Sequence, residues 1–127
     1  MNSKEIRTEK APLPVGPYSQ AVQAGNMVFV SGVLPLDMET KKIIETIPEA
    51  AKKIFSHLDN ILDKAGAQKN NIIKTTIFMK DLKQFAELNK VYAEYFSGVQ
   101  ILPARSTVEV AGLPLNAPVE MEFILQL

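Results

Sequence analysis

The chain has 127 residues and a mass of 14.0 kDa, which suits one domain with one hydrophobic core. Its 14 basic residues balance its 14 acidic residues, so a zero net charge argues against nucleic acid or an anionic membrane as the main partner. The lack of cysteine excludes disulfides, thiolate nucleophiles and zinc–thiolate sites. No apolar run approaches the roughly 20 residues of a membrane helix, and residues 1–12 do not resemble a secretory signal. We therefore expect a cytoplasmic protein.

The hydrophobic pattern predicts strands and helices in the order ββαβαββ. Two short apolar runs on either side of Gly25-Asn26 are typical of a β-hairpin. Apolar residues then recur at spacings of three and four over residues 47–65, which predicts one buried helix face. Pro48 suits the first turn of this helix, and Gly66 suits its C-terminal cap.

The second half of the chain continues the alternation of strands and helices. Residues 71–81 are rich in β-branched side chains and predict a strand, and residues 82–96 predict a second helix that ends at Ser97-Gly98. Two further strands are expected over residues 104–113 and 118–127. We expect residues 1–127 to form a single α+β domain, in which two helices pack on one face of one sheet.

Arg105 is an unusual residue for a strand that leads into a core. Because side chains alternate along a strand, Arg105, Thr107 and Glu109 should share one face. We expect that face to be the one that the helices leave uncovered, either solvated with cross-strand ion pairs or buried against another subunit. A guanidinium keeps its charge in a protein, so an inward orientation would require an anionic partner or ligand.

Few residues suggest conventional catalysis. His57 is the single histidine, and its position beside the apolar stripe of the first helix predicts a solvated side chain. One histidine cannot supply a multi-histidine metal site, and the acidic residues show no metal-binding spacing. On pattern alone, Tyr18 is a packing aromatic and Ser31-Gly32 simply ends a strand. An enzyme with these residues needs a reaction that requires little beyond an anchor and an activated water.

Four segments together resemble the RidA/YjgF family of reactive-intermediate deaminases. They are "GPYSQAV", "VSGVLPLD", "VYAEYF" and "PARSTVEVAGLP" followed by "VEMEF", in the family's order and spacing from about residue 7 to residue 125. The resemblance implies a chorismate-mutase-like fold and a homotrimer with three intersubunit clefts. It also implies hydrolysis of 2-imino acids such as 2-iminobutanoate and 2-iminopropanoate, and of their enamine tautomers, to 2-oxo acids and ammonia. That reaction prevents damage to pyridoxal-phosphate enzymes, and it requires no metal or organic cofactor.

The resemblance also assigns roles to individual residues. Arg105 matches the position that grips the substrate carboxylate, as bidentate arginine geometry allows. Glu120 matches the acidic residue that positions or activates the attacking water. The other cleft-lining positions correspond to Tyr18, Ser31, Gly32, Asn89 and Thr107.

The chain departs from the family pattern at two places. Some relatives have cysteine at the position of Thr107, so a hydroxyl or backbone group must suffice here, and residues 38–58 differ from the family's usual entry to the first helix. Three other functions stay open from the sequence: a trimeric module that binds small carboxylates without turnover, an endoribonuclease or translation inhibitor, and a chaperone. The absence of a basic, aromatic patch disfavours RNA as the partner.

Overall fold

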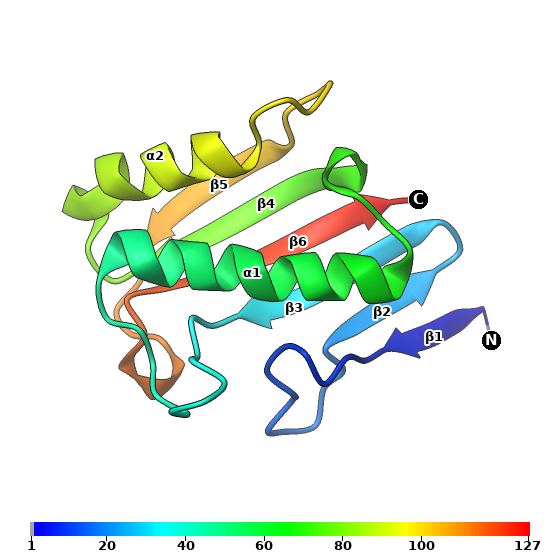
Figure 1. Ribbon diagram of the computed structural model, residues 1–127, viewed down its shortest axis with the longest axis horizontal. Helices are drawn as coiled ribbons and strands as arrows, with labels where there is room; N and C mark the ends of the chain where they lie inside the picture. Colours follow the sequence, from blue (N-terminus) through cyan, green and yellow to red (C-terminus); the bar gives the residue numbers. More distant parts are fainter. Residues whose placement is uncertain (1) are drawn as a thin grey trace.

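The computed structural model describes residues 2–127 and has six strands and two α-helices (Figure 1). The strands are β1 Ser3–Ile6, β2 Ala21–Ala24, β3 Met27–Val33, β4 Ile72–Met79, β5 Ala104–Glu109 and β6 Val119–Gln126. The helices are α1 Ile47–Ala65 and α2 Phe85–Tyr95. The sheet order is β1-β2-β3-β6-β4-β5, and only β4 and β5 run parallel, so the sheet is mixed.

The local signals that fix these elements are the ones that the sequence predicts. The turn Gly25-Asn26 joins β2 to β3, and Gly25 has a φ of 61°, a backbone conformation that glycine adopts without steric cost. Pro48 lies in the first turn of α1, and Gly66 ends this helix in the left-handed conformation. A 3₁₀ turn over Leu82–Gln84 precedes α2, so the second helix begins three residues later than predicted.

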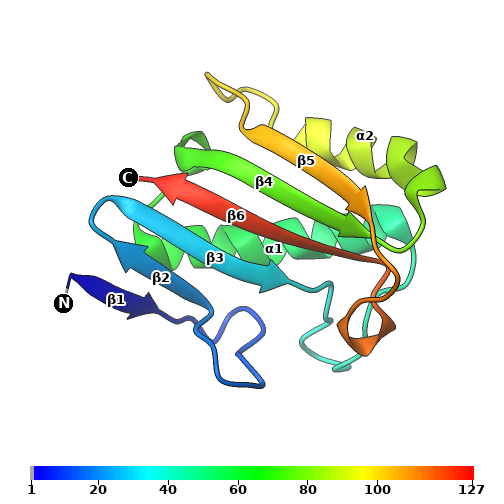
Figure 2. The same ribbon diagram turned by 180° about the vertical axis from the view of Figure 1, so that it is seen from behind.

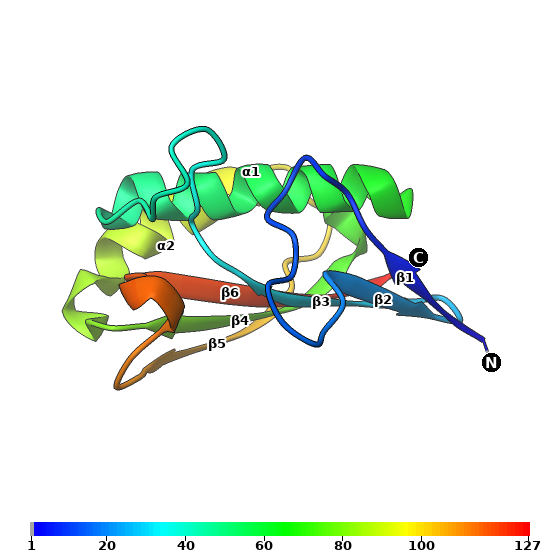
Figure 3. The same ribbon diagram turned by 90° about the horizontal axis from the view of Figure 1, so that it is seen from below.

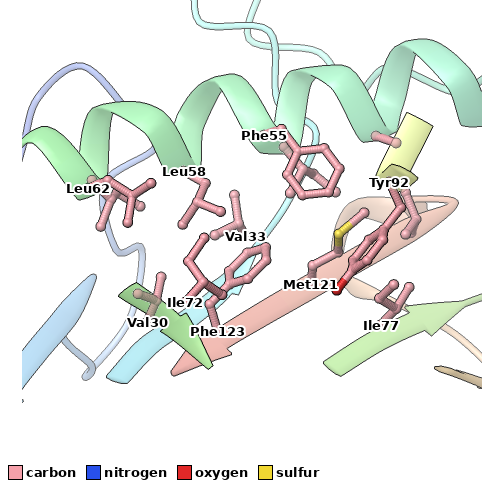
Figure 4. Packing of buried hydrophobic residues seen from close by; sticks show 14 of the residues in the cluster. Val30, Val33, Phe55, Leu58, Leu62, Ile72, Ile77, Tyr92, Met121 and Phe123 are labelled. Atoms are coloured by element: carbon pink, nitrogen blue, oxygen red, sulfur yellow. The ribbon is translucent and has the colours of Figure 1, made fainter. Parts of the chain in front are cut away.

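Both helices pack on the same face of the sheet, as the edge-on view shows (Figure 3). Figure 4 shows the core between the layers, where Phe55, Leu58 and Leu62 of α1 face the buried side chains of β3, β4 and β6. In β6 this buried set includes Met121 and Phe123, which the period-two pattern predicts. The predicted α+β fold, a single mixed sheet with two helices on one face, is confirmed.

The other face of the sheet carries no helix (Figure 2). The strand registers place five apolar side chains on it, from neighbouring strands: Val22, Phe29, Phe78, Val108 and Ile124. Phe29 and Val108 remain 47% and 43% exposed. Thr76 and Glu122 lie between the two parts of this broken apolar patch, which are Val22, Phe29 and Ile124 on one side and Phe78 and Val108 on the other. Exposed apolar side chains that gather on one sheet face are typical of a surface that another molecule covers.

Two expectations from the sequence about the strands are wrong. The strand β1 was not predicted, because "SKEI" buries only Ile6 and its pairing with β2 depends on backbone hydrogen bonds. Arg105 and Thr107 do share a face, but it is the helix-bearing face. The strand β5 lies at the sheet edge beside the exposed flank of α2, where a polar side chain can point toward the helices without entering the core.

Candidate functional site

Arg105 lies in a groove between β5 and α2. Its Nη1 donates a hydrogen bond to Asn89 Oδ1 at 2.8 Å. The guanidinium carbon lies 4.6 Å from the centre of the Tyr92 ring and 5.2 Å from that of Phe85. An amide and two rings hold the guanidinium in place, and none of these groups neutralises its charge. The expected cross-strand ion pair is therefore not what positions Arg105.

Thr107 lies two residues further along the same side of β5. Its Oγ1 is buried and has no hydrogen-bond partner among residues 2–127. Buried hydroxyls almost always have a partner, because leaving one unpaired costs free energy. The Thr107 hydroxyl is thus an unsatisfied polar group on the same side of β5 as Arg105. We refer to Asn89, Arg105 and Thr107 as the Arg105 group.

Glu120 lies on the face of the sheet that no helix covers. Its neighbours in β6, Val119 and Met121, are buried beneath the helices, so Glu120 points the other way. Burial, and then repulsion from Glu122, raise the pKa of the half-buried Glu120 carboxyl above its ordinary value. A carboxylate with a raised pKa is a stronger proton acceptor than an ordinary exposed one.

Gly32 allows the Glu120 side chain to come close to β3. A Cβ atom at position 32 would lie only 2.5 Å from Glu120 Oε2 and 2.7 Å from its Cδ. The β3–β6 register shifts between Val30 and Val33, so Gly32 lies in a bulge of β3. A side chain at position 32 would therefore displace the Glu120 carboxylate.

Tyr18 and Ser31 lie next to Gly32, around one small cavity of about 80 Å³. Ser31 Oγ donates a hydrogen bond to the Ser19 carbonyl at 2.6 Å, which fixes the end of β3 against the segment that carries Tyr18. Tyr18 is 52% exposed at this place. We refer to Tyr18, Ser31, Gly32 and Glu120 as the Glu120 group.

Within one chain the two groups do not form a single site. Arg105 pairs in register with Thr75, whose hydroxyl accepts a hydrogen bond from Tyr92 in the core, so the Arg105 group is on the helix-bearing side. Glu120 is on the opposite side of the same sheet. The seven residues predicted from sequence therefore divide into two sets that a single copy keeps apart.

Sequence reasoning missed two residues that shape the Arg105 group. The sequence pattern places Phe85 and Tyr92 only within the second predicted helix, yet Tyr92 both packs in the core and stacks on Arg105. The spacing of Phe85, Asn89 and Tyr92 could have revealed them, since residues at i, i+4 and i+7 share one helix face.

His57 is buried, and the expectation of a solvated histidine is wrong. Its ring is 3% exposed, and Nε2 lies 2.7 Å from the Leu36 carbonyl oxygen, to which it donates. Burial lowers the pKa of His57 below its ordinary value. The loop before α1 folds over this flank of the helix, and helical periodicity does not show which flank a distant loop will cover.

Residues 2–127 contain no group of three or more His, Asp or Glu side chains that could hold a metal ion. Along the same stretch, no helix combines the length and apolarity needed to cross a membrane.

Comparison with known proteins identifies the family of this chain. The family model described as "Endoribonuclease L-PSP" matches residues 8–126. A "RutC family protein" of Aquifex aeolicus is 49% identical over 121 residues, which cover 95% of this chain and 97% of the relative. "Reactive Intermediate Deaminase A, chloroplastic" of Arabidopsis thaliana is 46% identical over 123 residues, which cover 96% of this chain and 65% of the relative. The crystal structure of Escherichia coli TdcF with bound serine superposes with a TM-score of 0.92 at 38% identity, covering 98% of each chain.

The fold defines an α+β protein with a single mixed sheet and two helices on one face. The chain belongs to the Endoribonuclease L-PSP family, which is the RidA/YjgF family of the sequence resemblance.

Proposed function

We propose that this protein hydrolyses 2-imino acids, and their enamine tautomers, to 2-oxo acids and ammonia. The substrates include 2-iminobutanoate and 2-iminopropanoate, and their removal protects pyridoxal-phosphate enzymes. The similarity to a relative named Reactive Intermediate Deaminase A supports this activity. We place the reaction in the cytoplasm and assign it to one domain over residues 1–127, without a metal or organic cofactor.

The observation that carries the proposal is that the Arg105 guanidinium is held in place without a carboxylate partner among the groups that hold it. The guanidinium is held by Asn89, Tyr92 and Phe85, yet no carboxylate is among these partners. A fixed, unneutralised guanidinium is suited to bidentate binding of a substrate carboxylate. The Thr107 hydroxyl is buried and unpartnered and lies two residues further on the same side of β5, so a rotation of this side chain toward the substrate would give a further polar contact.

We propose that the complete site forms between two copies of the chain. One copy supplies the Arg105 group and the next supplies the Glu120 group, because one copy keeps them on opposite sides of the sheet. The apolar patch on the uncovered face is a suitable contact surface for such an assembly. A cyclic homotrimer would contain three of these sites.

The chemistry follows from the two groups. Arg105 holds the substrate carboxylate, so the electrophilic imine carbon lies at a fixed place beside Glu120. Glu120 accepts a proton from water as the water oxygen bonds to that carbon. Glu120 passes this proton to the nitrogen, which gives a carbinolamine. It then takes the hydroxyl proton and delivers it to the nitrogen as the carbon–nitrogen bond breaks, so ammonia leaves and the carbonyl forms. The raised pKa of Glu120 favours its role as the proton acceptor.

The family description names an endoribonuclease, and the residues of this chain favour it less. The net charge is zero, and the single histidine is buried with its ring nitrogen bonded to a backbone carbonyl. RNA binding normally requires a cationic surface, and acid–base cleavage requires an accessible proton carrier.

A coupled assay tests the proposal. Threonine dehydratase or an amino-acid oxidase generates the imine, and semicarbazide traps whatever the protein leaves unhydrolysed. The protein should accelerate release of 2-oxo acid and ammonia and reduce trapping of the imine. If 2-oxobutanoate binds but the rate of imine decay does not change, the protein is a carboxylate-binding module and the deaminase proposal is wrong.

A further inference from the structure

We infer that the cavity behind Tyr18, Ser31 and Gly32 receives the aliphatic side chain of the 2-imino acid and selects substrates by chain length. The inference rests on the proposed function, since it assigns a part of the substrate to a part of the same site. It adds to the Arg105 and Glu120 groups a specificity determinant formed by other residues of the cavity, Leu34 and Leu115.

The cavity lining is mostly apolar. Besides Tyr18, Gln20, Ser31 and Gly32, it consists of Pro12, Leu13, Pro14, Val15, Val33, Leu34, Leu36, Ile61 and Leu115. A space with these walls favours a hydrocarbon group over a charged or hydroxylated one.

Two of the polar side chains at the cavity, Gln20 and Ser31, are already hydrogen-bonded to the protein. Gln20 Oε1 accepts from the Thr8 amide at 2.8 Å, while its Nε2 donates to the Pro12 carbonyl at 2.8 Å and to the Thr8 carbonyl at 3.2 Å. Ser31 Oγ donates to the Ser19 carbonyl. Gln20 therefore holds the wall formed by Pro12 in place and leaves neither end of its amide free for a polar ligand.

Gly32 links the cavity to the place of the reaction. It lines the cavity and also lies against the Glu120 carboxylate, at the close distance described above. The cavity is also lined by Val33 and by Ile61 of α1, so it lies on the helix side of β3. A substrate whose imine carbon lies beside Glu120 would therefore extend its side chain past Gly32, near the end of β3, into the cavity. Its carboxylate then points away, toward Arg105 of the next copy.

The size of the cavity sets the expected chain length. Its volume is about 80 Å³, roughly half that of an apolar cavity of about 150 Å³ that holds benzene. Side chains of two to four carbons fit this space, and a benzyl group exceeds it. Methyl, the side chain of 2-iminopropanoate, leaves most of the space unfilled.

Leu115 restricts the same cavity and has an unusual backbone. Its φ is 56°, a left-handed conformation that non-glycine residues rarely adopt, and its side chain is 68% exposed. Such outliers concentrate at binding sites, where the surroundings hold them in place. We assign Leu115 and Leu34 as the residues that limit the length of the bound side chain.

The test measures kcat/KM for imines that an amino-acid oxidase makes from alanine, 2-aminobutyrate, norvaline, leucine and phenylalanine. In the wild type, kcat/KM should rise about fourfold for each methylene added from methyl to propyl. This factor corresponds to the free energy gained when one methylene is buried. The value of kcat/KM should then fall for the phenylalanine-derived imine, which has a benzyl side chain. Binding of the matching 2-oxo acids, measured by calorimetry, should follow the same order.

Two variants should change this profile in opposite directions. Leu34→Phe fills the cavity, so the rise in kcat/KM from the methyl to the propyl substrate should disappear. Leu115→Ala enlarges the opening of the cavity, so kcat/KM should rise for the leucine- and phenylalanine-derived imines. Leu82→Ala is the matched control, because Leu82 is also an exposed leucine, 42% exposed, and it does not line this cavity. Thermal midpoints show whether Leu34→Phe still folds, and Leu115→Ala tests the same cavity from an exposed position.

The outcomes separate this inference from the proposed function. Turnover that is equal for all chain lengths, with no change of profile in either variant, overturns the cavity assignment and leaves the deaminase proposal standing. Binding of 2-oxo acids that depends on chain length, without turnover of any imine, supports the cavity assignment and overturns the deaminase proposal.

Discussion

The proposed role of Arg105 as a carboxylate anchor depends on the side chains of α2 that hold its guanidinium, and not on its position in β5. Asn89 and two aromatic rings orient a charge that has no carboxylate among those partners. Arg105→Ala should therefore lower kcat/KM for 2-iminobutanoate by roughly tenfold to several hundredfold, the equivalent of ~1.5–3 kcal/mol for a charge-assisted contact. Arg105→Lys should restore little of this activity, since an ammonium lacks the planar fork of donors.

Arg7 provides the control for that experiment, because it is the only other arginine and is also exposed. Arg7→Ala should keep normal activity. If Arg105→Ala keeps normal activity, and 2-oxobutanoate still raises its thermal midpoint as in the wild type, Arg105 is not the carboxylate anchor.

Glu120 allows a catalytic role to be separated from a structural one. Its pKa is raised in the folded protein by burial and by Glu122, so the folded state holds this proton to a higher pH than the unfolded state does. The contribution of Glu120 to stability is therefore greatest at low pH and declines as pH rises through its raised pKa. Glu120→Gln removes that decline, while it should slow turnover by ~10²–10⁴-fold because an amide cannot accept the proton.

Thermal midpoints at pH 4 and pH 7, together with rates, test both parts of this prediction. From pH 4 to pH 7, the wild type should lose stability relative to Glu120→Gln. Glu122→Gln, a change of an exposed neighbour on the same strand, should retain most of the activity. An unchanged rate in Glu120→Gln would mean that backbone groups alone orient the water.

Gly32 gives an independent test of the position of the Glu120 carboxylate. In Gly32→Ala the new methyl group would overlap Glu120 Oε2, so the flexible carboxylate must move while the backbone stays as it is. We expect at least a tenfold loss of kcat, by analogy with losing the positioned base, and little change in thermal midpoint. Gly112→Ala is the matched control, since a Cβ there meets no atom within 4 Å. Equal rates in the two variants would contradict the proposed position of the base.

At the scale of elements, the sequence predicts what depends on local pattern. The apolar spacing of α1, the β-branched run of β4 and the Gly25-Asn26 turn each specify their structure within a few residues, and the structure confirms all three. The missed strand β1 and the side of β5 on which Arg105 lies depend instead on pairing and on the position of α2. For the same reason, the sequence could name residues of the site but could not show that they divide between two faces.

The bond between His57 and Leu36 connects α1 to the loop before it, and that loop forms part of the cavity wall. His57→Ala should cost ~1–3 kcal/mol of unfolding free energy, because it leaves the partly buried Leu36 carbonyl without its donor and removes a buried side chain. The folded-state pKa of His57 lies below the ordinary 6.5, so the unfolded state takes up this proton first as pH falls. Stability from this group is therefore complete above about pH 6.5 and is lost on acidification.

Chemical denaturation at pH 7.5 and pH 5.5, at one protein concentration, measures this effect. His57→Gln, which can still donate to the carbonyl but does not titrate, should lose less stability than the wild type between the two pH values. An equal loss in both proteins would show that other groups determine the acid sensitivity.

At the scale of the whole molecule, the two residue groups and the uncovered sheet face lead to one prediction. If neighbouring copies complete each other's sites, a defect in the Arg105 group and a defect in the Glu120 group should complement when they are in different copies. Arg105→Ala and Glu120→Gln, each nearly inactive alone, should recover activity when refolded together. In a cyclic trimer every mixed assembly contains one intact site, so random mixing should restore about a quarter of the wild-type sites.

The controls for mixing follow from the same geometry. The double variant Arg105→Ala, Glu120→Gln mixed with either single variant should recover nothing, since no interface then combines an intact arginine with an intact glutamate. Light scattering should give a mass of about 42 kDa, three times the 14.0 kDa chain, for every mixture. A monomeric protein, or single variants that never complement, would mean that each chain acts alone. Because Arg105 and Glu120 lie on opposite sides of one sheet, that result would also remove the carboxylate anchor from the reaction.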